Sequence, residues 1–253
     1  DLVAMCVNDL IVQGAKPFVF LDYISINKFN QKKLRSIIKG IVKGCITSDC
    51  ELAGGETAEM PGTYAARKFD IAGFAVGLVE KEKILRKEKV KNENVILAVP
   101  SSGLHSNGFS LVRYILNKKK IKLKNSKFLK KELLRPTKIY TKEILKINKK
   151  NLLNSCANIT GGGIADNIKR IIPDGLCANI YLNKIKVLKI FKYLKNFGVK
   201  DKEMLKTFNC GVGFCLVVNK KNVHKIKKFF NKQYQPYIIG KITKGNKKFK
   251  VHE

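Results

Sequence analysis

The sequence predicts an α/β fold of the α+β kind, arranged as two domains. Apolar runs typical of buried strands alternate with amphipathic helical segments along most of the chain. A charged stretch, EKILRKEKVKNEN at residues 82–94, interrupts this alternation. The 253 residues, 45% of them hydrophobic, suffice for sizeable cores. We therefore expect an N-terminal mixed-sheet domain over residues 1–85 and, over residues 86–253, a C-terminal α/β sandwich whose mixed sheet is flanked by helices.

The first domain opens with a helix that we expect to be buried. In DLVAMCVNDLIVQGA, residues 1–15, apolar side chains cover nearly every helical face, which predicts a buried helix over residues 1–14. A strand over 17–26 and an amphipathic helix over 31–48 follow. The apolar stripe of that helix consists of Ile37, Ile38, Ile41, Val42 and Cys45. A further strand is predicted over 68–80.

The second domain continues the alternation of strands and helices, and no internal repeat is evident. Strands are predicted near 94–100, 155–159, 175–180, 212–218 and 235–243. Helices are predicted near 106–119, 138–149, 163–171, 187–196, 201–207 and 222–232.

The segment GGETAEMPGTY, residues 54–64, suggests a site for a cation or a polyphosphate. Gly54 and Gly55 permit a backbone turn, and a helical turn after them would place Glu56 and Glu59 on one face. Pro61-Gly62 then ends the segment. The plainer alternative is a solvated helix start, because acidic residues favour a helix N-terminus.

Asn8 and Asp9 lie in the middle of the apolar first helix. A buried carboxylate is unfavourable unless it is paired or bound to a metal, so Asp9 suggests a cation site. Oxygen ligands of this kind suit Mg²⁺, which usually bridges to phosphates. The alternative is that a neighbouring backbone or side-chain group satisfies Asp9.

Two loops each follow a predicted strand and precede a predicted helix, the geometry in which free backbone N–H groups hold a phosphate. The first, Ser101–Gly108, is rich in Ser, Gly and Asn and contains His105, Ser106 and Asn107. The second carries Thr160, Gly161, Gly162 and Gly163. The alternative for the first loop is a plain connection capped by Ser106 or Asn107.

These segments together closely resemble the aminoimidazole-ribonucleotide synthetase family, also called phosphoribosylformylglycinamidine cyclo-ligases. The matching strings occur in the family's order from the first residue onward: DLVAMCVNDLIVQGA, FLDY (20–23), GGETAEMPG, FDIAGFAVGLVEK (69–81), SSGLHSNGFSLVR, LLRPTKIY (133–140), NITGGG and EMLKTFNCGVG (203–213). As a set they are specific.

The resemblance implies a ligase of purine synthesis that uses ATP and Mg²⁺ to cyclise formylglycinamidine ribonucleotide, and that forms a homodimer across the first domain's sheet. We expect Asp9 and Glu56 to bind the metal and, with His105, to serve catalysis. The expected ATP contacts are Asn8, Asp9, Gly54, Gly55 and Glu56. The expected substrate contacts are Ser101, Ser106, Asn107, Gly108, Thr160, Gly161, Gly162 and Gly163.

Two departures from the family pattern bear on activity. The family carries a further ATP-binding segment ahead of DLVAMC, so we expect this chain as given to bind the ribonucleotide phosphate without cyclising it. The alternative is a catalytically inactive remnant. The family also usually has His immediately before ITGGG, where this chain has Asn158, which puts a proton-transfer role at that position in doubt.

The formal net charge of +32 raises the alternative of a nucleic-acid-binding module. Lysines dominate over arginines, however, and are scattered among Asn and Ile, as in KKKIKLKNSKFLKK at 118–131. Sequence-specific readout favours Arg, so we expect solvated surfaces and no specific nucleic-acid partner. Another ATP-using relative, of the selenophosphate or thiamine-phosphate type, remains the nearest alternative enzyme.

Cysteine usage and hydropathy favour a cytoplasmic protein. The seven cysteines are odd in number, mostly lie in apolar stretches and form no C-x-x-C pair, which predicts reduced thiols and no zinc. No apolar run approaches the roughly 18 residues of a membrane-spanning helix. We therefore expect no membrane association.

Overall fold

The computed structural model describes residues 1–253 and divides into two compact units. Unit 1 comprises Asp1–Ile84 and the returning segment Ile139–Leu145. Unit 2 comprises Leu85–Lys138 and Lys146–Glu253. The division at Ile84 lies next to the boundary expected after residue 85, whereas the return of 139–145 to the first unit was not foreseen in the sequence.

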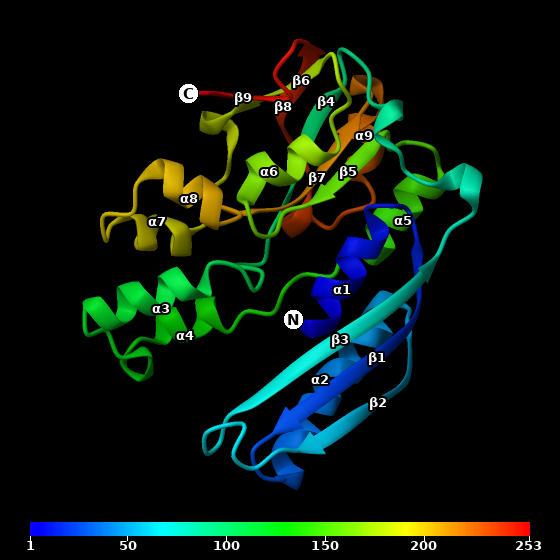
Figure 1. The fold of residues 1–253 in the computed structure, drawn as a ribbon. Coiled ribbons are helices and arrows are strands. Elements are labelled where there is room, and N and C mark those ends of the chain that lie inside the picture. Colours follow the sequence, from blue (N-terminus) through cyan, green and yellow to red (C-terminus); the bar gives the residue numbers. More distant parts are fainter. The chain divides into compact units, whose positions relative to one another are not determined.

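Unit 1 is a three-stranded mixed sheet with two helices on one face (Figure 1). β1 (Lys16–Ile26) is central, parallel to β2 (Glu51–Glu59) and antiparallel to β3 (Phe69–Leu78). The helices α1 (Leu2–Ile11) and α2 (Gln31–Ser48) bury their apolar stripes against it. The core includes Val3, Val7, Phe20, Ile24, Ile41 and Cys45.

The predicted glycine turn at residues 54–59 is wrong, because this segment is strand β2. In an extended strand, side chains three residues apart point to opposite faces, so Glu56 and Glu59 do not share one. Position 55 must be a glycine because a Cβ there would lie only 2.6 Å from a carboxylate oxygen of Asp22 on β1. Pairing with β1 holds this glycine-containing segment extended.

The prediction that α1 is buried on all sides is also wrong. Val3, Ala4, Val7, Asn8 and Ile11 are buried, but Asp9 is exposed. The helix lies on the sheet instead of inside a core, so one of its sides faces outward. The premise that Asp9 must be neutralised because it is buried therefore does not hold.

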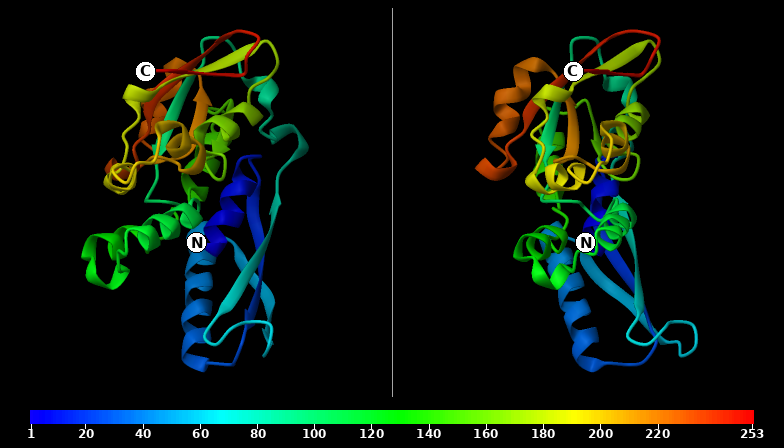
Figure 2. Two further views of the ribbon diagram at one scale, coloured as in Figure 1. Left: turned by 60° about the vertical axis from the view of Figure 1, so that its left-hand side comes forward. Right: turned by 90° about the vertical axis from the view of Figure 1, so that its left-hand side faces the viewer.

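Unit 2 contains a six-stranded mixed sheet with strand order β5-β7-β4-β8-β6-β9. Every neighbouring pair is antiparallel except β6 and β9. The strands are β4 (Val95–Pro100), β5 (Ser155–Asn158), β6 (Leu176–Tyr181), β7 (Val212–Val218), β8 (Tyr237–Lys244) and β9 (Phe249–His252). In Figure 2 the helices α6 and α9 lie on opposite sides of this sheet.

The helices of unit 2 are α3 (Phe109–Lys118), α4 (Lys127–Leu133), α6 (Gly163–Arg170), α7 (Lys189–Lys195), α8 (Asp201–Thr207) and α9 (Val223–Lys227). α5 (Thr141–Lys149) begins in unit 1 and ends in unit 2. One core lies between α6 and the sheet, and a second joins α3 and α4 to α7 and α8. The sequence did not predict the short elements α4 and β9 or the nine-residue strand β2.

The predicted fold class is confirmed, since both units combine a mixed sheet with helices. All seven cysteines are free thiols, six of them buried. Burial raises the pKa of Cys45 to about 11 and that of Cys210 to about 12, which keeps both thiols protonated. None of the helices combines the length and the apolar character that a membrane span requires.

Candidate functional site

Three segments of unit 2 meet at one edge of its sheet. β4 and β5 both run antiparallel to β7, which lies between them, so their carboxyl ends reach the same edge. The loop after β4, residues 101–108, leads into α3, and the loop after β5, residues 159–162, leads into α6. Residues 208–211 enter β7 at this edge.

Asn209 fastens the first loop to the segment that enters β7. Its side-chain NH₂ group donates to the carbonyl oxygens of Gly103 (2.9 Å) and Leu104 (3.2 Å). Its side-chain oxygen accepts from the Ser101 hydroxyl (3.1 Å) and the Gly211 amide (2.8 Å). Asn209 and Ser101 are buried. Ser101, an expected substrate contact, therefore uses its hydroxyl inside the protein.

His105 is buried within the same loop and is 4% exposed. Its Nε2 lies 2.9 Å from the backbone nitrogen of Ser102 and 3.4 Å from that of Lys138, and both N–H groups donate to it. Burial, followed by the charge of Lys138, lowers the pKa of His105 from 6.5 to about 3. The imidazole is therefore neutral at physiological pH.

The first loop presents Ser106 and Asn107 to solvent. Ser106 is exposed and Asn107 is half-buried. The backbone is left-handed at His105 (φ 55°) and Ser106 (φ 62°), an uncommon conformation for residues other than glycine. Gly108, also left-handed, has a second constraint, because a Cβ there would overlap the ring of Phe208.

The second loop is held by Asn167 on α6. The side-chain NH₂ group of Asn167 donates to the carbonyl oxygens of Gly163 (2.8 Å) and Gly161 (3.2 Å). Thr160 lies at the same cluster, with its hydroxyl 3.4 Å from the Asn167 side-chain oxygen. This asparagine acts on the second loop as Asn209 acts on the first.

Gly161, Gly162 and Gly163 differ in their backbone conformation and in the space around them. A Cβ on Gly163 would overlap the carbonyl oxygen of Leu205, and Gly162 has a φ of 87°. Gly161 is exposed, and a Cβ there would have only the Asn107 side-chain oxygen, at 3.8 Å, within 4 Å. The two loops thus lie side by side at Gly161 and Asn107, and only Gly161 leaves open space above its backbone.

In unit 1, the strand register separates the two carboxylates expected to share a metal. Glu56 pairs with Tyr23, whose ring lies on the face of the sheet opposite α1 and α2. Asp9 belongs to α1 itself. The structure contains no group of three or more His, Cys, Asp or Glu side chains that could hold a metal ion. Within one chain, Asp9 and Glu56 therefore do not converge.

Asn8, expected beside the metal, is buried, and its side-chain oxygen accepts a hydrogen bond from the backbone N–H of Tyr140 (3.0 Å). Tyr140 lies in the returning segment of unit 1. Asn8 therefore fastens that segment to α1. The strings FNCGVG and ADNIKR contained Asn209 and Asn167, but no spacing rule distinguishes such asparagines from surface ones.

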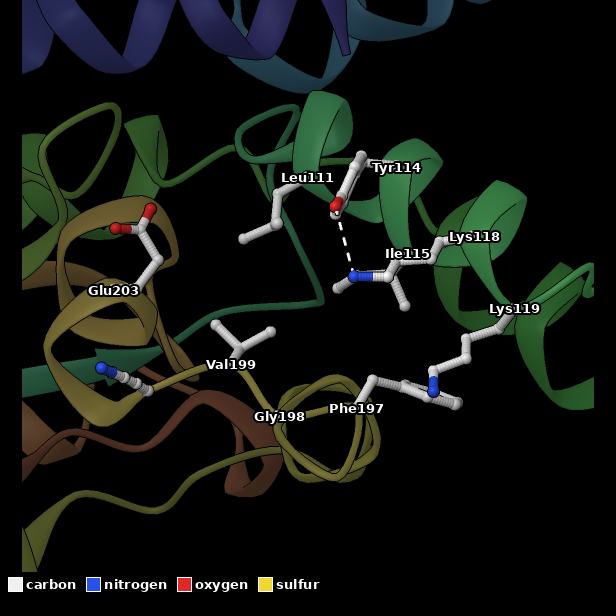
Figure 3. Close-up of a pocket in the computed structure, with 10 residues that line it drawn as sticks. Leu111, Tyr114, Ile115, Lys118, Lys119, Phe197, Gly198, Val199 and Glu203 are labelled. Atoms are coloured by element: carbon white, nitrogen blue, oxygen red, sulfur yellow. Dashed lines mark hydrogen bonds between the residues drawn. The ribbon is translucent and has the colours of Figure 1, made fainter.

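Unit 2 also contains a separate cavity of about 360 Å³, between α3 and the start of α8. Figure 3 shows the residues that line it. Leu111, Tyr114 and Ile115 line one side, and Phe197 and Val199 line the other. The Lys118 ammonium lies 3.5 Å from the Tyr114 hydroxyl. None of the expected site residues lines this cavity.

The two units define a recognised class of protein. Residues 1–79 match the family model described as AIR synthase related protein, N-terminal domain, and residues 91–252 match that of its C-terminal domain. The chain belongs to the AIR synthase related family.

Within that family the chain is similar to curated phosphoribosylformylglycinamidine cyclo-ligases. It is 45% identical to the one from Carboxydothermus hydrogenoformans, over 100% of this chain and 76% of the relative. It is 46% identical to the one from Pseudothermotoga lettingae, over 98% of this chain and 75% of the relative. The resemblance seen in the motifs is confirmed.

Solved structures with the same fold are more distant in sequence. Thiamine monophosphate kinase from Aquifex aeolicus superposes with a TM-score of 0.68 at 19% identity, covering 98% of this chain and 78% of the kinase. A chain of a HypE–HypF complex superposes with a TM-score of 0.73 at 18% identity, covering 99% of this chain and 79% of its own. These similarities show the fold alone.

Proposed function

We propose that this chain is an ATP-dependent cyclo-ligase that converts formylglycinamidine ribonucleotide into aminoimidazole ribonucleotide, with ADP and phosphate as the other products. The observation that carries the proposal is the 45% identity to a phosphoribosylformylglycinamidine cyclo-ligase along the whole chain. The ligase class and its place in purine synthesis follow from the same relationship.

The reaction requires activation of a poor leaving group. ATP transfers its terminal phosphoryl group to the formyl-amide oxygen, and an amidine nitrogen then attacks that carbon, closing the imidazole ring and releasing phosphate. The protein's part in phosphoryl transfer is to position the reactants and neutralise charge. The excess of basic residues in unit 2 provides a field that attracts such anionic substrates.

We assign substrate contact to the edge where the two loops meet. Ser106, Asn107 and Thr160 offer polar side chains there, and Gly161 leaves its backbone open to a phosphate. Gly108, Gly162 and Gly163 would serve through the shape of the loops, and Ser101 through its bond to Asn209.

Asp9 is the proposed Mg²⁺ ligand in unit 1. Its exposed carboxylate fits a metal that is usually held by one or two carboxylates together with substrate phosphates and water. Mg²⁺ would neutralise phosphate charge during the transfer. Gly54, Gly55 and Glu56 stay proposed as nucleotide contacts, although Glu56 lies on the other face of the sheet.

That other face supports the proposed homodimer. It exposes large apolar side chains on two strands: Leu21 (40%), Tyr23 (41%), Phe74 (65%), Val76 (38%) and Leu78 (60%). Monomeric proteins rarely expose contiguous apolar patches of this kind, so we propose that a second copy covers it. Glu56 would then lie at the interface between the two copies.

The free, largely buried thiols support a reducing compartment, and we propose the cytosol. An ATP-using kinase of the thiamine-phosphate type is the remaining alternative enzyme, but only the fold supports it.

The decisive test is to incubate the purified full-length protein with formylglycinamidine ribonucleotide, ATP and Mg²⁺ and to measure the aminoimidazole product and ADP together. We expect equal amounts of both. Thiamine monophosphate serves as the control substrate. Its phosphorylation, with no imidazole formed, would overturn the proposal in favour of the kinase.

A further inference from the structure

The Nε2 atom of His105 accepts hydrogen bonds from two segments of the chain and so holds its loop in place. A backbone N–H carries a hydrogen that cannot be removed, so an acceptor must face it. Nε2 of His105 receives two such groups, from Ser102 at 2.9 Å and from Lys138 at 3.4 Å. A proton on Nε2 would point at both, so Nε2 carries none and the ring proton is on Nδ1.

The neighbouring hydroxyl adds to the same arrangement. The Ser102 Oγ lies 2.9 Å from Nε2 and 2.7 Å from the carbonyl oxygen of Pro136, and its single hydrogen can be donated to either acceptor. Arg135 also donates to the Ser102 carbonyl, at 3.3 Å. His105 therefore ties the loop after β4 to residues 135–138, two segments about thirty positions apart in the sequence.

This tie acts where the backbone is strained. His105 and Ser106 are both left-handed, and a conformation of this kind persists only when the surroundings hold it. The next residue, Asn107, donates to the His105 carbonyl at 2.8 Å. Releasing Nε2 would leave two backbone N–H groups without their acceptor and would loosen the turn that presents Ser106 and Asn107.

We propose that His105 is a positioning residue that fixes the substrate loop as a permanently neutral hydrogen-bond acceptor and transfers no proton in the reaction. This inference rests on the proposed function only for the identity of the substrate. It revises the catalytic role expected for His105 from the sequence. The positive charge of Lys138, beside the ring, further disfavours a protonated imidazole.

Two variants distinguish a hydrogen-bond acceptor at position 105 from a general acid or base. Gln in His105→Gln supplies a side-chain oxygen that can accept from Ser102 and Lys138 but cannot act as a general acid or base near neutral pH. Leu in His105→Leu supplies no acceptor. We expect His105→Leu to raise the KM for the ribonucleotide and lower kcat/KM by about tenfold to a hundredfold, because buried N–H groups lose their partner. The KM for ATP should stay the same, and His105→Gln should recover most of the loss.

Nuclear magnetic resonance of ¹⁵N-histidine-labelled protein gives a readout independent of activity. The chain has three histidines, and the His105 signals are those missing in His105→Gln. We expect the Nδ1–H tautomer, unchanged from roughly pH 5.5 to 8.5, the range in which an ordinary histidine titrates. Titration of His105 within this range, or equal loss of activity in the Gln and Leu variants, would overturn the proposal. An inactive wild type with the expected tautomer would contradict the proposed function alone.

Discussion

At the scale of single residues, position relative to the sheet decides what a polar side chain can do. Some polar side chains are buried and form hydrogen bonds within the protein, as do those of Asn8, Ser101 and Asn209. Asp9 and Ser106, in contrast, are exposed to solvent. Sequence motifs place both kinds within a few residues of one another.

Asp9→Asn in the full-length protein tests the proposed metal ligand. Because Asp9 is exposed, the exchange of one oxygen for NH₂ should leave the melting temperature unchanged. Loss of a ligand charge should remove most ATP-dependent turnover and raise the Mg²⁺ concentration needed for half-maximal rate. Glu51→Gln, an exposed carboxylate at the start of β2, is the matched control. Turnover like that of the wild type with the same Mg²⁺ dependence would exclude Asp9.

Gly161→Ala tests the phosphate site without disturbing the loop. Apart from its chain neighbours, the new Cβ would have only the Asn107 side-chain oxygen within 4 Å, at 3.8 Å, so stability should stay constant while the ribonucleotide KM rises several-fold. Gly162→Ala is the structural comparison. Alanine at this φ of 87° should lower the free energy of unfolding by about 1–2 kcal/mol, which a lower melting temperature would show. A normal KM in Gly161→Ala would mean that the phosphate binds elsewhere.

At the scale of elements, the sheet of unit 1 has two unlike faces. One carries α1 and α2 over Phe20 and Ile24, and the other exposes Tyr23 and Phe74. The alternation of side chains along β1 produces this difference, because neighbouring residues point to opposite sides. The same alternation puts Glu56 beside Tyr23 and away from Asp9.

Phe74→Glu tests whether the apolar face is a contact between copies. Phe74 is 65% exposed, so the change should leave the fold of the chain intact. A charge in an apolar interface is strongly unfavourable, and we expect sedimentation velocity to show a dimer for the wild type and a monomer for the variant. Leu134→Glu, at a 72% exposed position of unit 2, is the control and should remain dimeric. A monomeric wild type would refute the dimer.

At the scale of the whole molecule, charge is distributed unevenly. Residues 1–80 contain as many acidic as basic residues, so the net charge of +32 comes from the rest of the chain. The lysines of that part lie mostly on exposed positions, as in the stretch from Lys118 to Lys131. Such a surface attracts anions without selecting among them.

We expect the chain to bind duplex DNA weakly and without sequence preference. Fluorescence anisotropy with two unrelated duplexes should give the same affinity for both. Binding should fall steeply between about 50 and 200 mM salt, because it depends on the release of counterions. Tight binding to one sequence at physiological salt would instead support the nucleic-acid-binding module.

The sequence by itself determined most of the fold. Helices 31–48 and 201–207 and strand 212–218 were predicted at their observed bounds, because continuous apolar stripes or runs mark them. The family was also evident from the motifs, as were the two loops that we propose bind the substrate. These features are local, since each depends on residues close together in the chain.

The tertiary structure decided what depends on distant partners. β2 is a strand because β1 lies beside it, although its glycines suggest a turn. Asp9 is exposed because α1 lies on a sheet, and Glu56 is on the other face because of strand register. His105 accepts hydrogen bonds from Ser102 and Lys138, and only folding brings Lys138 to its ring. Burial and hydrogen bonding across the fold thus assign roles that residue type and spacing leave open.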